Sequence, residues 1–389
     1  MADHRILVIA DDLTGALEVG GKFAATGVRS QVRTPSSLWA EDLRVAAGAF
    51  VVDTETRHAR VTEAARRVSD LARAACEAGF SHVYKKTDST LRGNIGAELA
   101  ALIEAWGGAP LFYVPAYPQM GRTVKGGTLY VNGVTVSATH VSSDPFNPVT
   151  ESHIPTILCS QCRQPIRSVP VTDIGPAAPG VITLCDGETD DDVEVAARVY
   201  TSSSDFRLSA GPAGFAASLA RLLDLPRAHP TPLPRIKTAL VVNGSLHPVS
   251  HQQVEQAKQV GFKSIESDSL PSDLDDRSWI VLEKAGGSGE ATLDFAQGLA
   301  KSAIRLLGQF AFDALIIFGG DTAYAIVDAL GNPPLHVLGE VMEGVPVCRI
   351  EAERLSSHAG HRHQDLYLVT KAGSFGPPDV LSALRELLS

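Results

Sequence analysis

The stretch ILVIADDLTGA, residues 6–16, decides the fold class, because an apolar run passes directly into two aspartates and a helical pattern. Five consecutive apolar residues, 6–10, are typical of a strand that is buried on both faces of a parallel sheet. Ligands of open α/β sheets bind beyond the carboxyl ends of such strands, where Asp11 and Asp12 stand. The stretch therefore predicts a parallel α/β sheet with a polar binding site at one edge.

Apolar runs and helical patterns alternate along the rest of the chain, as is typical of an α/β protein. We expect strands at 6–10, 49–52, 82–85, 111–114, 239–242, 279–282, 314–318 and 366–369. Apolar spacing of three or four predicts helices at 62–78, 95–106, 249–260, 291–307 and 323–330. Residues 120–185 are rich in turn formers, which predicts loops and short strands that decorate the first domain.

The length of 389 residues exceeds one ordinary hydrophobic core, which predicts two domains. The stretch LPRAHPTPLPRI, residues 225–236, contains four prolines and reads as a stiff connector. We therefore expect an N-terminal domain at 1–228, a linker at 229–236 and a C-terminal domain at 237–389. Each domain should hold a mostly parallel sheet flanked by helices, with the ligand site in the cleft between them.

Composition argues against several classes of protein. The net charge is −10, from 34 Lys and Arg against 44 Asp and Glu, and no basic stripe indicates a nucleic-acid partner. No apolar run is long enough to span a membrane, and the N-terminus lacks the pattern of a signal peptide, so we expect a cytoplasmic protein. The sequence is compatible with a homo-oligomer. Of the five cysteines only Cys159 and Cys162 have metal-ligand spacing, and the second pair of a four-ligand site is missing.

The first polar motif is ADDLTGA, residues 10–16. One of the two aspartates can cap the following helix through its side chain. The other is then available to bind substrate hydroxyls, to accept a proton or to hold a metal ion. The alternative is that both carboxylates only cap and solvate the turn. The nearby run GALEVGGKF, residues 15–23, is not a phosphate-binding P-loop, because Phe23 stands where Ser or Thr must hold Mg²⁺.

The second motif is KKTDSTLRGNIGAEL, residues 85–99, at another expected junction of strand and helix. Lys86 and Arg92 supply positive charge, and the planar fork of an arginine suits a carboxylate. Asp88 and Ser89 suit hydrogen bonds with hydroxyl groups. A ligand with a carboxylate at one end and hydroxyls along its length would satisfy all of them. The alternative is a surface cluster of ion pairs at a helix start, which contributes little stability. The block PAYPQMGRTVKGGTLYVNG, residues 115–133, is equally explained by a connecting loop.

Four glycine-containing turns follow expected strands in the second half of the chain. They are VNGSLHPVS with Gly244 and Ser245, FGGDTA with Gly319, Gly320 and Asp321, GEVMEGVP at 339–346, and TKAGSFG at 370–376. Backbone N–H groups at helix starts and in such turns bind phosphate. Together the four turns favour a nucleotide site in the C-terminal domain.

The motifs ADDLTGA, KKTDSTLRG, PAYPQMGRTVKGGTLYVNG, NGS, FGGDTA, EGVP and KAGSFG occur in this order over nearly the whole chain. In this ordered set the chain resembles the four-carbon acid sugar kinase family, formerly a domain of unknown function, which includes kinases for threonate, erythronate and 3-oxo-tetronate. The resemblance implies a sugar-acid-binding N-terminal domain and a nucleotide-binding C-terminal domain. It also implies phosphoryl transfer from ATP, with Mg²⁺, to a terminal hydroxyl.

The resemblance assigns site residues by position. The substrate pocket would contain Asp11, Asp12, Lys86, Asp88, Ser89 and Arg92. The nucleotide site would contain Ser245, Gly319, Gly320, Asp321, Met342, Glu343, Gly344, Val345 and Gly373. Many relatives carry Asp where this chain has Glu18, and the longer side chain is expected to change which sugar acid fits if it faces the ligand.

Phosphoryl transfer needs positioning and charge neutralisation more than covalent help from the protein. We predict that Asp12 is the catalytic base or the orienter of the attacking hydroxyl, with Asp88 as the competing candidate. Asp11 would bind hydroxyls or Mg²⁺, while Arg92 and Lys86 would hold the acid end. Two other classes stay open. One is a non-enzymatic sensor of a sugar acid and a nucleotide; the other is a lyase or dehydrogenase, which lacks support from a dinucleotide fingerprint.

Overall fold

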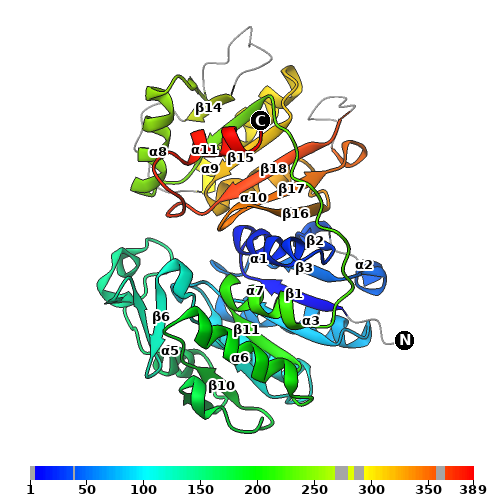
Figure 1. The fold of residues 1–389 in the computed structure, drawn as a ribbon, viewed down its shortest axis with the longest axis vertical. Helices are drawn as coiled ribbons and strands as arrows, with labels where there is room; N and C mark the ends of the chain where they lie inside the picture. The colour runs from blue at the N-terminus through cyan, green and yellow to red at the C-terminus, as the bar shows by residue number, and fades with distance from the viewer. Residues whose placement is uncertain (1–4, 38–39, 268–278, 284–292, 356–363) are drawn as a thin grey trace. The chain divides into compact units, whose positions relative to one another are not determined.

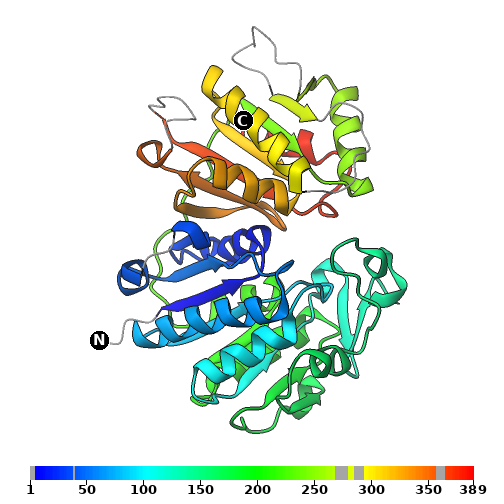
Figure 2. The same cartoon turned by 180° about the vertical axis from the view of Figure 1, so that it is seen from behind.

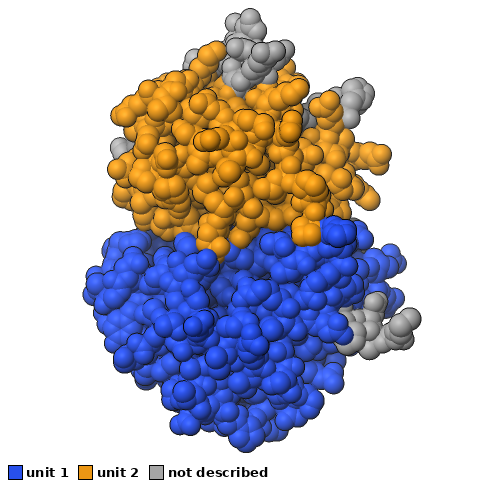
Figure 3. Space-filling view, in the orientation of Figure 1, with its two compact units in different colours: residues 1–30, 38–229 blue, residues 31–37, 230–389 orange. Residues whose placement is uncertain are grey.

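The computed structural model describes residues 5–37, 40–267, 279–283, 293–355 and 364–389. The chain divides into two compact units, coloured in Figure 3. Unit 1 contains residues 1–30 and 38–229, and unit 2 contains residues 31–37 and 230–389. Among the described residues, no helix combines the length and the apolar character that crossing a membrane requires.

Unit 1 is built on a parallel sheet of seven strands. Their order is β3 (Ala49–Asp53), β1 (Ile6–Ala10), β4 (His82–Lys86), β11 (Leu208–Gly211), β5 (Leu111–Tyr113), β10 (Ile182–Cys185) and β9 (Ile166–Val169). Every residue of β1 and β3 is buried. The apolar run that opens the chain forms an inner strand because both of its faces are covered by helices.

Helices cover both faces of this sheet (Figures 1 and 2). One layer contains α1 (Leu13–Ala25), α7 (Ala213–Leu222) and α6 (Asp190–Ser202), and neighbouring members are in contact. The other contains α3 (Val61–Glu77) and α4 (Ile95–Ala105), which pack against each other. The short helices α2 (Ala40–Val45) and α5 (Ile154–Gln161) contact α3 and α4, respectively.

The middle of the chain differs in part from its prediction. A small antiparallel sheet of β6 (Arg122–Lys125), β7 (Thr128–Val131) and β8 (Val134–Thr135) fits the expected short strands. However, β9 and β10 extend the main sheet, and all four residues of β10 are buried. β10 therefore belongs to the core, while β9 is the half-exposed strand at the end of the sheet. They are short, four residues each, and the surrounding Pro, Ser and Gly obscure them in the sequence.

Unit 2 has a mixed sheet. Its parallel part contains β13 (Lys263–Glu266), β14 (Trp279–Glu283), β12 (Ala239–Asn243), β15 (Ala314–Phe318) and β18 (Leu366–Lys371). The hairpin of β16 (Leu335–Met342) and β17 (Val345–Ile350) continues it in antiparallel fashion next to β18. The residues 31–33 of β2 (Ser30–Arg33) group with this unit.

Helices also cover the sheet of unit 2. Figure 2 shows α9 (Leu293–Gln309) and α10 (Gly320–Ala329) in front of it, and these two pack together. On the other face, α8 (Pro248–Gln259) contacts α11 (Val380–Leu387). The α/β class with a mostly parallel sheet is therefore confirmed. The β16–β17 hairpin was not predicted, although it carries the EGVP turn.

Candidate functional site

The first candidate site lies at the carboxyl edge of the sheet in unit 1. The strands β3, β1 and β4 are adjacent and parallel, and Ala10 is paired with both Asp53 and Lys86. Their carboxyl ends therefore meet at one edge. Asp11 follows β1 directly, Asp53 ends β3 and Lys86 ends β4. Two carboxylates and an ammonium therefore lie at neighbouring strand ends. All three residues are buried.

The two adjacent aspartates have different local roles. Asp12 is the N-cap of α1, and its Oδ1 accepts a hydrogen bond from the N–H of Gly15 at 2.9 Å. A β-carbon on Gly15 would lie 2.6 Å from Asp12 Oδ1 and 2.7 Å from Lys86 Nζ, so only glycine allows both groups this close. Asp11 is the carboxylate that does not cap. Its Oδ1 is buried and accepts no hydrogen bond within the described residues.

Arg57 joins the aspartates, and the sequence analysis missed it. Its Nε donates to Asp11 Oδ2 at 2.8 Å, and its Nη1 donates to Asp12 Oδ2 at 2.6 Å. Nη2 lies 3.7 Å from Asp88 Oδ2. The backbone N–H of Arg57 also donates to the carbonyl of Asp11 at 3.1 Å. One arginine on the turn after β3 therefore links both aspartates of the first motif to the aspartate of the second.

Asp88 and Arg92 form the second half of this cluster. Asp88 Oδ1 accepts from Thr90 and from Arg92 Nε at 3.1 Å, and Oδ2 accepts from Arg92 Nη2 at 2.8 Å. Arg92 Nη1 donates to Asp144 at 3.3 Å. These bonds use three of the five N–H groups of the guanidinium. The Arg92 side chain keeps 32% of its surface exposed, so two N–H groups stay available to a ligand.

The remaining predicted residues lie around this centre. Lys86 Nζ is buried and lies 3.9 Å from Glu18 Oε2, which places Glu18 on the inner side of α1. Ser89 is half-buried in the turn after β4. Lys85 is wholly buried and pairs with Glu98 at 3.1 Å, so this ion pair stabilises the edge from within the core. All predicted residues of the substrate pocket are thus brought together.

Burial and ion pairing set the charges of the cluster. Burial alone would raise the pKa of Asp11, but Arg57 and Lys85 outweigh it and lower that pKa. Burial opposes ionisation of Asp88 too, yet Arg92 and Arg57 hold its pKa well below the usual range. Asp53 is the exception. Burial, with Asp12 and Asp11 nearby, raises its pKa to about 7.

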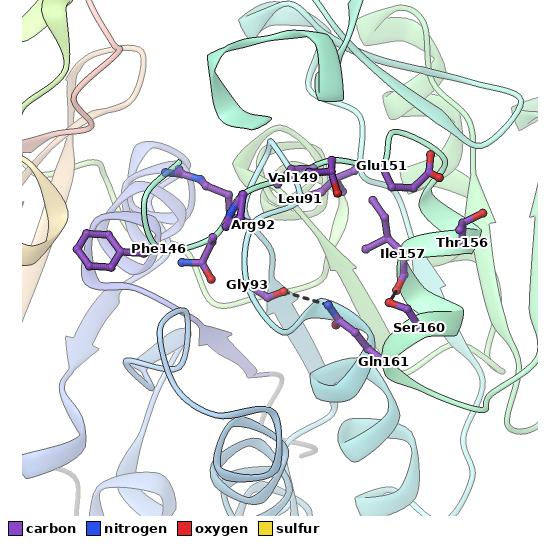
Figure 4. Close-up of a pocket in the computed structure, with 13 residues that line it drawn as sticks. Leu91, Arg92, Gly93, Phe146, Val149, Glu151, Thr156, Ile157, Ser160 and Gln161 are labelled. Atoms are coloured by element: carbon purple, nitrogen blue, oxygen red, sulfur yellow. Dashed lines mark hydrogen bonds between the residues drawn. The ribbon is translucent and has the colours of Figure 1, made fainter. Parts of the chain in front are cut away.

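A pocket of about 410 Å³ opens beside Arg92 (Figure 4). Its wall includes Arg92, Asn147 and Gln161, and Phe146 and Ile157 supply apolar surface. The side chain of Gln161 fixes the wall, because Nε2 donates to the carbonyl of Gly93 at 3.2 Å. Arg92 therefore faces both the carboxylate cluster and an open pocket.

The second candidate site is in unit 2, where three of the predicted glycine turns meet. Strands β12, β15 and β18 are adjacent, so the turns that follow them share one edge. A β-carbon on Gly244 would lie 1.8 Å from Thr322 Oγ1, and one on Gly373 would lie 2.3 Å from Ser245 Oγ. Gly319 has φ of +105°, which favours glycine, and caps α10. The close approach of these backbones explains why glycines occupy the turns.

The fourth turn joins the same region through the β16–β17 hairpin. Met342 ends β16, Glu343 and Gly344 form the turn, and Val345 begins β17. A β-carbon on Gly344 would lie 2.5 Å from Phe375 Cδ2, so the hairpin turn packs on the TKAGSFG loop. Asp321 is exposed in the first turn of α10, directly after Gly320. The predicted nucleotide residues therefore gather at one edge of unit 2.

Three charged residues at the two edges were not predicted: Arg57, Asp53 and Lys371. Each lies at or just after the carboxyl end of a parallel strand. The strands were predicted, but none of these three residues is one of the turn glycines or paired aspartates that mark the other strand ends as ligand sites. Applied to the strand at 49–52, the rule that ligands bind beyond strand ends would have selected DTETR, residues 53–57.

Comparison with known proteins agrees with this division. A family described as a sugar-binding N-terminal domain matches residues 6–219, and one described as a nucleotide-binding C-terminal domain matches residues 282–381. A D-threonate kinase of Bordetella bronchiseptica is 32% identical over 99% of both chains. A 3-oxo-tetronate kinase of Brucella melitensis is 27% identical over 96% of this chain and 93% of its own.

The fold has a solved counterpart. The crystal structure of a Haemophilus influenzae protein covers 98% of this chain and 100% of its own, with a TM-score of 0.72 at 20% identity. Fold and site thus define a protein with a sugar-binding and a nucleotide-binding domain. More closely, the chain belongs to the four-carbon acid sugar kinase family, and the resemblance seen in the motifs is confirmed.

Proposed function

We propose that the protein is an ATP-dependent kinase that phosphorylates the terminal hydroxyl of a four-carbon sugar acid: threonate, erythronate or 3-oxo-tetronate. The observation that carries the proposal is the cluster in which Arg57 links Asp11, Asp12 and Asp88. Carboxylates accept hydrogen bonds from hydroxyl groups, and arginines bind carboxylates. Such a mixture suits a polyhydroxylated acid better than a purely apolar or purely anionic ligand.

We assign the two ligands to different parts of the chain. The sugar acid binds in the domain at 1–228, at the edge formed by β1, β3 and β4. ATP binds in the domain at 237–389, at Ser245, the Gly319–Gly320 turn, the 342–345 hairpin turn and Gly373. The linker at 229–236 joins them. The family matches support this assignment, because they describe an N-terminal sugar-binding and a C-terminal nucleotide-binding domain.

At the sugar-acid site, Lys86 and the two remaining N–H groups of Arg92 hold the acid end. Asp11 Oδ1 accepts from a hydroxyl of the substrate, since this oxygen accepts no hydrogen bond from the described residues. Asp12 orients the attacking hydroxyl, with its own position fixed by the cap to Gly15 and by Arg57. In a loose transition state little charge builds on the attacking oxygen early, so orientation matters more than proton removal.

Mg²⁺ is usually held in kinases by one or two carboxylates together with phosphate oxygens. Among the described residues, no group of three or more His, Cys, Asp or Glu could hold a metal ion. One exposed carboxylate, Asp321, stands beside the glycine turns, which fits an ion that arrives with the nucleotide. We assign Asp321 to it. When bound, the ion neutralises phosphate charge.

The test is a coupled assay of ADP release with Mg²⁺ and ATP, against threonate, erythronate and the 3-oxo-tetronates. We expect turnover that depends on one of these acids and a phosphorylated product. Uncharged alditols of the same length serve as the control and should support little turnover. A protein that binds the acid and the nucleotide but releases no ADP with any acid would be a sensor, and the kinase proposal would be wrong.

A further inference from the structure

Lys371 is a buried lysine at the nucleotide edge for which the proposed mechanism has no role. It ends β18 and is fully buried. Its Nζ donates to the carbonyls of Ala372 at 2.9 Å and Gly373 at 3.3 Å. Nζ also lies 3.5 Å from Ser250 Oγ and 4.3 Å from the centre of the Phe318 ring. Among the residues that the structure describes, the ammonium therefore meets only neutral groups.

These contacts fix the direction of two peptide groups. In a trans peptide the carbonyl and the N–H point to opposite sides, and the described residues contain no cis peptide. The carbonyls of Ala372 and Gly373 turn inward to Lys371, so the N–H groups of Gly373 and Ser374 turn outward. Within the described part of the chain, neither N–H donates to a backbone carbonyl, and Ser374 is exposed.

The same turn packs closely against the other nucleotide turns. A β-carbon on Gly373 would lie 2.3 Å from Ser245 Oγ and 3.0 Å from His247 Cβ. A β-carbon on Gly319 would lie 3.2 Å from the backbone nitrogen of Ser245. Ser250 Oγ further fixes the turn by donating to the carbonyl of Gly373 at 2.8 Å. The two free N–H groups therefore stand beside the turns that we assign to ATP.

We propose that Lys371 is a positioning residue for the nucleotide: its ammonium holds the carbonyls of Ala372 and Gly373 inward, so that the N–H groups of Gly373 and Ser374 bind a phosphate. The inference rests on the proposed function and assigns a buried positive charge, that of Lys371, to the nucleotide site. Oriented N–H groups form anion-binding concavities, and a cation on their carbonyl side strengthens them. Lys371 acts through the turn, because no part of its side chain reaches the surface.

Nucleotide binding should then depend on the protonation of Lys371. Burial lowers the pKa of Lys371 to about 7, and no charged side chain among the described residues contributes to the shift. The elements around it present Phe318 from β15 and Ser250 from α8. Other titratable groups at this edge are His247 and His251 on α8 and Asp321 on α10. A bound phosphate favours the ammonium, so above pH 7 binding must take up a proton.

The test is calorimetric titration of the full-length protein with Mg²⁺ and ADP between pH 7 and 9. For the wild type we expect affinity to fall by up to about 10-fold per pH unit. Lys371→Met should weaken binding at pH 7 by about 10-fold or more, because charge-assisted hydrogen bonds are lost. Its affinity should also be nearly independent of pH. Lys258→Met removes an outer lysine of α8, paired with Glu255 and Glu283, and should behave as the wild type.

The outcomes separate the two proposals. A wild type that binds no ADP at any pH would overturn the proposed function itself. A wild type that binds ADP with the same affinity at pH 7 and 9 would overturn only the role of Lys371. So would a Lys371→Met variant with an unchanged pH dependence, because the histidines or the nucleotide would then be responsible. If Lys371→Met fails to fold, Ser250→Ala serves in its place, because it removes the hydroxyl that holds the carbonyl of Gly373 inward. It should weaken binding a few-fold while keeping the pH dependence, and an unchanged affinity would overturn the proposal.

Discussion

The two candidate sites lie at the same place in the fold, the carboxyl edge of a parallel sheet, but different groups line them. In unit 1 the edge consists of charged side chains that bind one another. Arg57 pairs with Asp11 and Asp12, Arg92 pairs with Asp88, and Lys86 lies beside Glu18. In unit 2 the edge consists of glycine turns over a buried lysine, Lys371. A hydroxylated acid offers hydroxyl donors together with a carboxylate, whereas a nucleotide phosphate offers only negatively charged acceptor oxygens. The difference fits the ligands that we propose for the two edges.

The comparison has an energetic consequence. Charges in unit 1 are paired within the cluster, and removing one partner leaves the others buried and uncompensated. In unit 2 the close packing of backbones is the sensitive feature, so an added methyl group should weaken ligand binding there, by less than a lost charge does in unit 1.

The largest effect is expected for Arg57→Met, which leaves Asp11 and Asp12 without their shared partner. Activity should fall by at least about 10³-fold, and the free energy of unfolding should fall by about 3–5 kcal/mol. Steady-state kinetics and urea unfolding measure the two effects. The control is Arg66→Met, since Arg66 pairs with Glu63 and Asp70 on the exposed face of α3. That change should have little effect on stability, because water screens an exposed ion pair. Equal effects of both variants would mean that the cluster has no special role.

Asp12→Asn should have the next largest effect, on turnover rather than on folding. Asparagine still caps α1, so stability should change little, while kcat should fall by about 10²-fold or more because the charge that orients the hydroxyl is lost. Asp88→Asn, measured in parallel, tests the competing assignment. If Asp88→Asn is nearly inactive while Asp12→Asn keeps most of its kcat, the roles are reversed.

Gly319→Ala tests the steric side of the comparison. At φ of +105° a side chain is strained by about 1–3 kcal/mol, and its β-carbon would crowd the nitrogen of Ser245. We expect ADP affinity to fall by about 10-fold or more, with sugar-acid affinity unchanged. Gly298→Ala is the matched control, because a β-carbon at that place in α9 meets nothing within 4 Å. A Gly319→Ala variant that binds ADP as tightly as the control would remove the turn from the site.

The smallest effect concerns pH and stability. Burial raises the pKa of Asp53 to about 7 from 3.8, so between these values the folded state holds a proton that the unfolded state releases. Asp53 therefore favours folding at low pH, and this contribution is lost as pH rises to 7. Asp53→Asn mimics the protonated acid and should gain on the order of 2 kcal/mol relative to the wild type between pH 5 and 8.

Thermal unfolding of Asp53→Asn and the wild type at pH 5 and pH 8 checks this difference. Lys371 in unit 2 should show the opposite sign. Burial lowers its pKa from 10.5 to about 7, so stability rises with pH between these values. An Asp53→Asn variant whose stability relative to the wild type is the same at both pH values would show that Asp53 is ionised in the fold.

Much of the architecture was readable from the sequence, because inner parallel strands are continuous apolar runs. The strand at 6–10 was predicted to the residue, and that at 314–318 likewise. The hairpin β16–β17 was missed because Leu338 and Met342 are apolar residues at half-buried positions of β16, which hides its alternation of buried and half-buried residues in the sequence. Strands β9 and β10 were missed because they are short and lie among turn formers.

The sequence predicted the site residues that stand together in polar motifs. It did not predict those that enter the site singly from other turns. Asp11, Asp12 and Asp88 stand in such motifs, and their meeting follows from the order of strands. Arg57 comes from a different turn, and only the pairing of β1 with β3 brings it to the aspartates. The cytoplasmic location and the homo-oligomer stay predictions from sequence.

The central claim is that the charged edge of unit 1 binds the acid and the glycine turns of unit 2 bind the nucleotide. Calorimetry on the full-length protein tests it directly, with ADP as one ligand and the acid selected by the ADP-release assay as the other. Arg57→Met should lose affinity for the acid and keep its affinity for ADP, while Gly319→Ala should do the reverse. If Arg57→Met loses ADP and keeps the acid, or Gly319→Ala loses the acid and keeps ADP, the assignment of the two sites is contradicted.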